Sequence, residues 1–360
     1  MNFRARQTRL REQFSAARLD ALLVSHLPNI RYLCGFTGSA GLLLVEEAGS
    51  VFFTDVRYDT QAREEVRGAK VVIARKAPLQ ALGEFLSKRR ERACVIGLES
   101  EHFTVADKKR LRKLLPAGIA LKDSFSIVER LRMVKDEDEL ARIRAAVALG
   151  AKLFDRALEV LRPGAKEVDV AAEMELTARR AGAEAMSFPT IIASGVRSAL
   201  PHGRASEQRI ARAAFVVCDF GVILSGYCSD QTRTVWVGRA DKEALCIYEA
   251  VRQAQQSAID AVRPGIPAGE VDAAARNALK KSGLGKYFSH STGHGVGLEI
   301  HESPRVADGQ KEVLRPGMVI TIEPGVYFPG KWGIRIEDMV VVTDQGCEVL
   351  TPTSKDFLAV

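Results

Sequence analysis

The sequence predicts an α/β domain over residues 1–128, followed by a larger α+β domain over residues 129–360 that contains an internal duplication. In the first part, short apolar runs alternate with helical stretches, which is typical of an α/β domain. In the second part, the tripeptide Arg162-Pro-Gly164 recurs as Arg263-Pro-Gly265. A chain of 360 residues with 46% apolar content can also bury two sizeable cores.

The N-terminal elements follow from the spacing of the apolar residues. Phe3, Leu10, Phe14 and Leu19 can share one broad face, which predicts an amphipathic first helix. Apolar runs bounded by turn residues then predict strands, and segments with helical spacing lie between them. The predicted strands are Ala21–Ser25, Gly41–Val45, Val51–Thr54, Val71–Ala74 and Cys94–Gly97, and the predicted helices are Thr60–Arg67, Leu79–Arg90 and Ala106–Leu115.

We place the hinge between the domains near Ile127–Lys135. Directly after it, Asp136 and Glu139 have the spacing of a capping box, which predicts the start of a helix. Apolar residues continue at helical spacing as far as Leu161, so one long helix is expected to end before Arg162-Pro-Gly.

The repeated tripeptide belongs to a longer internal repeat. Glu167-Val-Asp169 follows the first copy, and Glu270-Val-Asp272 follows the second. In each copy a long helix precedes Arg-Pro-Gly and another helix follows, and then come strands with a histidine near their end. A half duplicated in this way would place a site at the junction of two sheets.

The net charge of +7 comes from the N-terminal part of the chain. The first 128 residues contain 22 Lys and Arg against 14 Asp and Glu, partly in the basic runs Lys88–Arg92 and Lys108–Lys113. Such runs can contact nucleic acid or an acidic surface. No aromatic interleaving or nucleic-acid motif accompanies them, so a solvated helix face is preferred and no nucleic-acid partner is expected.

No run of 18 apolar residues occurs in the sequence, so neither a membrane span nor a membrane partner is expected. The first residues, rich in arginine, lack the apolar region of a secretory signal. The six cysteines show no CxxC spacing, and several lie in apolar strand-like segments. We therefore expect free thiols in a reducing, cytoplasmic compartment.

Five residues of the second domain have the types needed to hold two divalent metal ions: Asp219, Asp230, His294, Glu323 and Glu337. Two such ions repel each other, and four carboxylates would offset their four positive charges. Scattered surface acids are the alternative. Each of the five residues, however, lies in an apolar or glycine-rich context, where an unpaired carboxylate is costly.

Asp219 and Asp230 lie in two apolar, β-branched runs that are broken near Gly221 and Gly226. This pattern predicts a hairpin with both acids pointing at one spot. Three histidines, His290, His294 and His301, then cluster within twelve residues among several glycines, which allow close approach of the backbone to a ligand.

Glu323 and Glu337 each lie in an apolar run that predicts a core strand. A carboxylate in such a strand needs a partner, which is either a metal ion or an arginine. Arg335 shares a strand face with Glu337, so it can pair with Glu337 or point into the site toward a substrate carboxylate. The residues alone leave both alternatives open.

Four segments together resemble a known family: Thr292–Leu298, His301–Pro304, Glu323-Pro-Gly and Arg335–Asp338. They are similar to the pita-bread-fold metallopeptidases, in the branch that contains Xaa-Pro dipeptidase (prolidase) and Xaa-Pro aminopeptidase. The resemblance covers essentially the whole chain and implies a creatinase-type N-terminal domain before a pita-bread catalytic domain. In that family the N-terminal domain helps to form dimers and can close over the partner's active site. The resemblance therefore makes the loop around Phe36 a candidate lid, with a structural turn as the alternative.

The resemblance also implies roles for the five candidate ligands. Asp230 and Glu337 would bridge two ions, Asp219 would bind one of them, and His294 and Glu323 would bind the other. A hydroxide that bridges the metals would attack the scissile carbonyl, and Glu323 would relay the proton. The hardness of the donors places Mn²⁺ first, with Co²⁺, Fe²⁺ and Zn²⁺ possible.

Further residues match the substrate side of the family site. His202 and His301 would stabilise the tetrahedral intermediate, and a capping or core role is the alternative for His202. By resemblance, the substrate-binding set is His290, Arg335, the proline-pocket candidates Phe188, Ile191 and Ile300, and the carboxylate anchor Arg305. A plain core position is an equally open alternative for each of the three apolar residues, and a solvated surface position is one for Arg305.

The sequence therefore predicts a homodimeric two-metal exopeptidase that acts on small peptides with proline at the second position. Methionine aminopeptidase shares the ligand set but normally lacks the N-terminal domain. A non-catalytic pita-bread scaffold, or a binding module that uses the basic N-terminal face, belongs to a different class. The complete ligand set argues against both the scaffold and the binding module. The sequence leans slightly toward prolidase but does not separate dipeptidase from aminopeptidase.

Overall fold

A computed structural model describes residues 1–88 and 94–360. The internal contacts divide the chain into two compact units, Met1–Arg132 and Met133–Val360. This division lies inside the hinge predicted at Ile127–Lys135. Most of the predicted basic run Lys88–Arg92 lies outside the described residues. Within the described part of the chain, no helix has both the length and the apolar character needed to cross a membrane.

A six-stranded mixed sheet with the order β4-β3-β2-β1-β5-β6 forms the centre of the N-terminal unit. Strands β1, β5 and β6 run parallel to one another, whereas β2 is antiparallel to both β1 and β3. The elements are α1 Phe3–Arg11, α2 Phe14–Ala17, β1 Ala21–Val24, α3 Leu27–Cys34, β2 Leu42–Glu46, β3 Gly49–Asp55, α4 Asp59–Glu65, β4 Lys70–Ala74, α5 Pro78–Ser87, β5 Cys94–Glu99, α6 Val105–Leu114, β6 Ile119–Ser124 and α7 Ile127–Arg132.

The five predicted strands and three predicted helices of this unit are present, with ends that shift by a few residues. The predicted end of the helix Leu79–Arg90 lies outside the described residues. The predicted first helix is divided into α1 and α2, with Leu10 and Phe14 buried and Phe3 only partly buried. Strand β6 and helices α3 and α7 are additional. Strand β6 was not predicted because it contains the charged residues Lys122 and Asp123, which break the apolar run. An edge strand can keep such side chains in solvent.

The Phe36 ring is part of the core of the N-terminal unit. It is 1% exposed and packs against Phe52 and Tyr58, with ring centroids at 4.6 and 5.5 Å. A Cβ on Gly38 would clash with the rings of both Phe36 and Tyr58. These contacts favour the structural turn over a lid for this loop.

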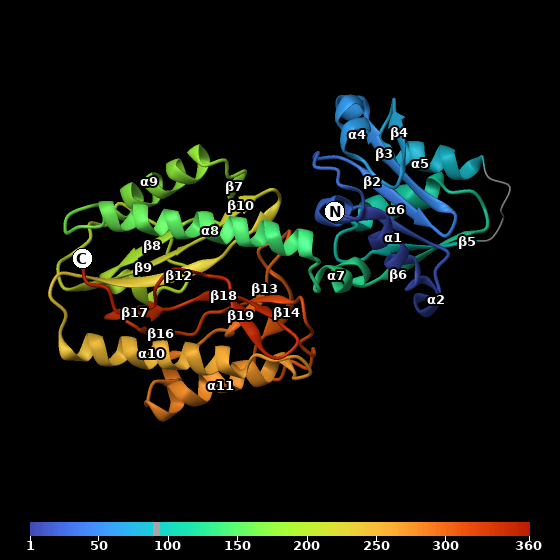
Figure 1. Cartoon of the computed structure of the whole chain (residues 1–360). Coiled ribbons are helices and arrows are strands. Elements are labelled where there is room, and N and C mark those ends of the chain that lie inside the picture. Colours follow the sequence, from blue (N-terminus) through green and yellow to red (C-terminus); the bar gives the residue numbers. More distant parts are fainter. Residues whose placement is uncertain (89–93) are drawn as a thin grey trace. The chain divides into compact units, whose positions relative to one another are not determined.

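Two pairs of helices enclose the strands of the C-terminal unit, with α8 and α9 on one side and α10 and α11 on the other (Figure 1). The helices are α8 Glu137–Val160, α9 Glu167–Arg180, α10 Lys242–Ala261 and α11 Ala268–Lys281. The strands are β7 Ala185–Met186, β8 Ile191–Ser194, β9 Ala214–Phe220, β10 Val222–Leu224, β11 Tyr227–Cys228, β12 Gln231–Val237, β13 Gly293–Gly295, β14 Glu302–Val306, β15 Val319–Ile322, β16 Gly325–Phe328, β17 Trp332–Arg335, β18 Asp338–Val342 and β19 Cys347–Val349.

Two sheets of this unit carry the candidate site, with the strand orders β12-β9-β8 and β14-β13-β15-β18-β19. Apolar residues of α8 and α9 pack on the first sheet, and those of α10 and α11 pack mainly on the second. The predicted long helix is confirmed as α8. Its capping box is formed by Asp136 Oδ1 with the Glu139 N–H at 3.0 Å and by Glu139 Oε2 with the Asp136 N–H at 3.1 Å.

The repeated tripeptide forms the same corner twice. Gly164 and Gly265 both have φ of +87°, in the region that favours glycine. The Gly164 N–H donates to the Ile210 carbonyl at 2.8 Å, and the Gly265 N–H donates to the Leu314 carbonyl at 2.9 Å. In both copies a helix therefore ends, turns at glycine and pairs with a segment that comes later in the chain, as a duplicated half requires.

Candidate metal centre

One cavity of about 850 Å³ in the C-terminal unit is lined by every residue that the sequence singled out for the site. Three acids on its wall, Asp219, Asp230 and Glu337, are buried, whereas several histidine and arginine residues on the wall are exposed. The predicted residues on its wall are Phe188, Ile191, His202, Asp219, Asp230, His290, His294, Ile300, His301, Arg305, Glu323, Arg335 and Glu337.

Asp219 and Asp230 share one face of the β9–β12 pair. Asp219 is paired with Thr232, and Asp230 lies two residues before Thr232, so both carboxylates project to the same side. The predicted simple hairpin is wrong in one respect. The residues between the strands leave the pair to form β10 and β11 in a separate sheet with β7. Gly221 allows this departure, because a Cβ there would lie 1.9 Å from the Ser229 carbonyl oxygen.

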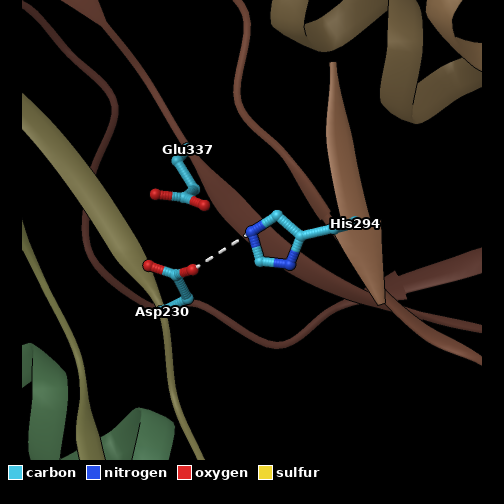
Figure 2. Close-up of side chains that lie close together, drawn as sticks. All are labelled: Asp230, His294 and Glu337. Atoms are coloured by element: carbon cyan, nitrogen blue, oxygen red, sulfur yellow. Dashed lines mark ion pairs between the residues drawn. The ribbon is translucent and has the colours of Figure 1, made fainter. Parts of the chain in front are cut away.

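Asp230, His294 and Glu337 point toward one another (Figure 2). One possible ligand atom from each lies within 4.8 Å of the others. His294 Nε2 is 3.5 Å from Asp230 Oδ2 and 3.5 Å from Glu323 Oε1. The other ring nitrogen, Nδ1, donates a hydrogen bond to the Gly295 carbonyl at 3.0 Å. In the neutral imidazole Nε2 therefore carries no hydrogen, and its lone pair faces the acids.

The last two acids occupy strand ends and not strand interiors, which corrects the sequence expectation. Glu323 directly follows β15, and Glu337 lies between β17 and β18. Thr232 Oγ1 donates to Glu337 Oε2 at 2.7 Å, and Thr321 Oγ1 lies 3.4 Å from Glu323 Oε1. Strand ends let these side chains from different strands converge on one point.

Burial and mutual repulsion disfavour ionisation of the acid cluster. Burial, followed by repulsion from Glu337, holds the pKa of Asp230 well above its usual range, and burial does the same for the pKa of Glu337. Burial raises the pKa of Glu323 to about 8, and burial lowers the pKa of His294 to about 4, so this imidazole is neutral at pH 7. Crowded carboxylates beside a neutral imidazole fit divalent cations, which would relieve the repulsion.

Arg335 pairs with Asp219 and not with Glu337, and it also lines the cavity, so its expected orientation toward a substrate carboxylate stays a prediction. Its guanidinium also donates to Thr232 Oγ1 at 3.1 Å and to Tyr327 Oη at 2.7 Å. The Tyr327 hydroxyl in turn lies 2.9 Å from His290 Nε2. These contacts connect His290 to the edge of the acid cluster.

Sequence reasoning missed Thr232 and Tyr327. The period of two along a strand was the available signal for Thr232, since it follows Asp230 by two residues. Tyr327 ends the segment Glu323-Pro-Gly-Val-Tyr, but nothing in that segment indicates that its hydroxyl reaches Arg335. Further residues on the cavity wall were also not anticipated, namely Pro189, Pro201, Arg204, Ser289, Ser291, Glu302 and Ser303.

The open side of the cavity carries His202, His301 and Arg305, which are all exposed. The His301 ring packs 4.4 Å from the ring of His294. Although the residue as a whole is exposed, partial burial of its ring and the nearby His202 lower the pKa of His301, which favours its neutral form. Phe188, Ile191 and Ile300 supply apolar wall beside these polar groups.

Residues 141–344 match metallopeptidase family M24, and residues 6–134 match the creatinase/prolidase N-terminal domain. The chain belongs to metallopeptidase family M24. It is therefore a hydrolase of peptide bonds, which excludes the non-catalytic scaffold as an account of this chain. The predicted fold, a creatinase-type α/β domain followed by a pita-bread catalytic domain, is confirmed.

Several relatives of this M24 peptidase are similar over nearly their full length. An uncharacterized peptidase of Bacillus subtilis is 37% identical, with 97% of this chain and 98% of the relative covered. The solved Xaa-Pro dipeptidase from Bacillus anthracis is 37% identical and has a TM-score of 0.96, with 100% of both chains covered. The solved X-Pro aminopeptidase from Thermotoga maritima is 34% identical and has a TM-score of 0.90, with 99% of this chain and 100% of that chain covered.

Proposed function

We propose that this M24 peptidase is a two-metal exopeptidase that hydrolyses the bond between an N-terminal residue and proline. The observation that carries the proposal is a single cavity in which buried acids face exposed histidines and an apolar wall. Similarity to solved proteins described as Xaa-Pro dipeptidase and X-Pro aminopeptidase supports the choice of substrate.

The two ions would be held by Asp219, Asp230, His294, Glu323 and Glu337. Oxygen and imidazole donors favour Mn²⁺, with Co²⁺, Fe²⁺ and Zn²⁺ as further candidates. Bound divalent ions supply polarisation of a carbonyl and activation of water at neutral pH. Three of the donors lie within 4.8 Å of one another, and this short spacing supports the assignment.

The chain's own residues would manage the proton and the carbonyl oxygen. Glu323, whose Oε1 lies 3.5 Å from His294 Nε2, would accept a proton and pass it to the leaving amine. His202 and His301 would donate hydrogen bonds to the oxygen that becomes negative during attack, and neutral His301 has an N–H for this purpose. Tyr327 and Arg335 would keep His290 in place through the contacts at 2.9 and 2.7 Å.

On the substrate side, Phe188, Ile191 and Ile300 would contact the pyrrolidine ring. Arg305 would bind the free carboxylate of a dipeptide, because its exposed guanidinium lies on the cavity wall. His290 and Arg335 complete the proposed substrate-binding set. Similar solved proteins include an Xaa-Pro dipeptidase and an X-Pro aminopeptidase, so the proposal covers both activities. The match to the creatinase/prolidase N-terminal domain disfavours methionine aminopeptidase, which normally lacks such a domain.

We further propose a homodimer in the cytoplasm. All six cysteines are free thiols in the structure, which fits a reducing compartment. The family resemblance supports the dimer, and sedimentation equilibrium would test it directly.

The deciding experiment compares a dipeptide Xaa-Pro with the same dipeptide extended by one residue. Metal-stripped protein is supplied with Mn²⁺, and release of the N-terminal amino acid is followed by chromatography. Cleavage of the dipeptide alone would make the protein a prolidase, and cleavage of the longer peptide would make it an aminopeptidase P. Release of methionine from Met-Ala-Ser, without cleavage before proline, would contradict the proposal.

A further inference from the structure

The carboxylate of Glu302 holds together a segment that forms one wall of the cavity. Its Oε1 accepts the backbone N–H of Glu299 at 3.1 Å, and its Oε2 accepts Nζ of Lys135 at 3.1 Å. Both oxygens also lie against Gly297, where a Cβ would come within 2.6 Å of each of them. The backbone from Gly297 to Glu302 therefore packs closely against the carboxylate of Glu302.

Lys135 reaches this carboxylate from an anchored position. Its side chain is 1% exposed, and that of Glu302 is 7% exposed. The Lys135 backbone N–H donates to the Gly317 carbonyl at 2.9 Å, and the preceding residue Val134 is paired with Met318. Asp136, the N-cap of α8, follows directly. The lysine thus ties the start of a long helix to the wall of the cavity.

The segment around Glu302 carries several of the residues proposed to contact the peptide. Ile300 and His301 precede Glu302, Arg305 follows it, and all three line the cavity. The Glu302 backbone is paired with Gly295 where the register shifts, directly beside His294. A shift of Glu302 would therefore move His301 relative to His294. Misplacement by about 1 Å is enough to lower an enzyme's rate substantially.

We propose that the Lys135–Glu302 ion pair positions the wall at residues 300–305 for peptide binding. The inference rests on the proposed function in one respect, since that wall is taken to contact the substrate. The pair holds the wall and does not load metal, because neither residue belongs to the five candidate ligands. Loss of one partner leaves the other charge buried without its counterion, which drives local rearrangement of the segment.

The test substitutes Lys135→Met in the full chain loaded with Mn²⁺. We expect kcat/KM to fall about 10-fold to 100-fold, mostly through a higher KM, because the wall binds the peptide before reaction. Metal content, measured by mass spectrometry, should equal that of the wild type. Lys135→Arg keeps the charge and should restore most of the loss. The matched control is Lys152→Met, which removes an exposed lysine from α8 and should leave KM unchanged.

A second variant keeps the test decisive if Lys135→Met does not fold. The double substitution Lys135→Met with Glu302→Gln removes both charges, which commonly recovers stability. We expect it to fold with normal metal content and a raised KM. A stability loss with KM and kcat within twofold of the wild type would mean a merely structural pair and would overturn the inference, as would loss of bound metal.

The outcomes also separate this inference from the proposed function. If the wild type cleaves some other peptide but none with proline at the second position, the proposed function fails, and the same variants are then measured on the peptide that is cleaved. If the wild type cleaves before proline and Lys135→Met leaves both KM and kcat within twofold of the wild type, the positioning role fails and the proposed function stands.

Discussion

Two regions of the catalytic unit bury carboxylates in opposite ways. Glu167, at the start of α9, is fully buried, and both of its oxygens are surrounded by donors. Ser194 donates through its N–H and hydroxyl at 2.7 and 2.9 Å, Ser206 donates at 3.1 and 2.7 Å, and Arg197 Nε lies at 3.0 Å. In the acid cluster, no side chain of the described residues donates a hydrogen bond to the Asp230 carboxylate, and the nearest ring nitrogen, His294 Nε2, presents its lone pair at 3.5 Å.

Burial by itself therefore does not separate a structural acid from a metal-binding one. The supply of donors does, because a buried carboxylate with a full set of hydrogen bonds is stable without further charge. A buried acid that faces other acids gains from a proton or a cation. By this criterion Glu167 fits a structural role, and Asp230, Glu323 and Glu337 fit the proposed role of metal ligands.

Substitution of a cluster acid gives the largest expected contrast. Asp230→Asn should lower peptidase activity and metal affinity by at least about 100-fold, since loss even of outer partners of a metal site costs 10-fold to 100-fold. The metal-free variant should melt no lower than the metal-free wild type, because one repelling charge is gone. Calorimetry, metal analysis and hydrolysis rates provide the measurements, and normal activity with normal metal content would contradict the assignment.

The pH dependence of the stability of the metal-free protein tests the same repulsion. The raised pKa of Glu323 means that the folded chain binds this proton more tightly than the unfolded chain, so stability of the metal-free protein falls as pH rises from about 4.3 to about 8. Added Mn²⁺ should stabilise by about 2.7 kcal/mol at one hundred times its Kd. Because metal binding displaces these protons, the apparent Kd falls as pH rises. At one fixed Mn²⁺ concentration the gain in melting temperature should therefore grow from pH 6 to pH 8, and an equal gain at every pH would speak against repelling acids in the cluster.

The donor-rich acid should respond in the opposite way. Glu167→Gln places an amide among donors, so the free energy of unfolding should fall by about 1–3 kcal/mol while kcat/KM of the folded protein stays near the wild-type value. Urea denaturation measures the first quantity. The matched control is Glu207→Gln, an exposed acid of the same unit, which should change stability by less than about 0.5 kcal/mol. Loss of metal from Glu167→Gln would break the comparison.

The smallest effect concerns the thiol beside Asp219. Burial raises the pKa of Cys218 to about 12, so this cysteine should resist alkylation at pH 8, whereas exposed Cys246 should react. If the strand pair alone holds Asp219 in place, removal of metal should leave Cys218 protected. Peptide mass spectrometry after iodoacetamide treatment measures the alkylation of Cys218, with Cys246→Ser as the control. Rapid labelling of Cys218 without metal would show that the acids depend on metal for their position.

Much of the site could be predicted because its residues are unusual where they stand. An acid in an apolar run, such as Asp219 or Glu323, signals a partner from sequence alone. The partner itself was harder to predict. Pairing with Glu337 was one of two alternatives for Arg335, yet Arg335 pairs with Asp219, from which the chain separates it by 116 positions. Tyr327 was missed for the same reason, since the role of its hydroxyl depends on Arg335 and His290 coming together.

The sequence by itself determined the chemistry of the ligands, the positions of most helices and strands, and the duplicated corners at Gly164 and Gly265, because these depend on residue type and short-range spacing. The tertiary structure decided which acids share a site, which are saturated by donors, and that Lys135 reaches Glu302. Those outcomes depend on the registers of strands distant in sequence, and a charge is stabilised by whatever groups the fold brings within a few ångströms of it.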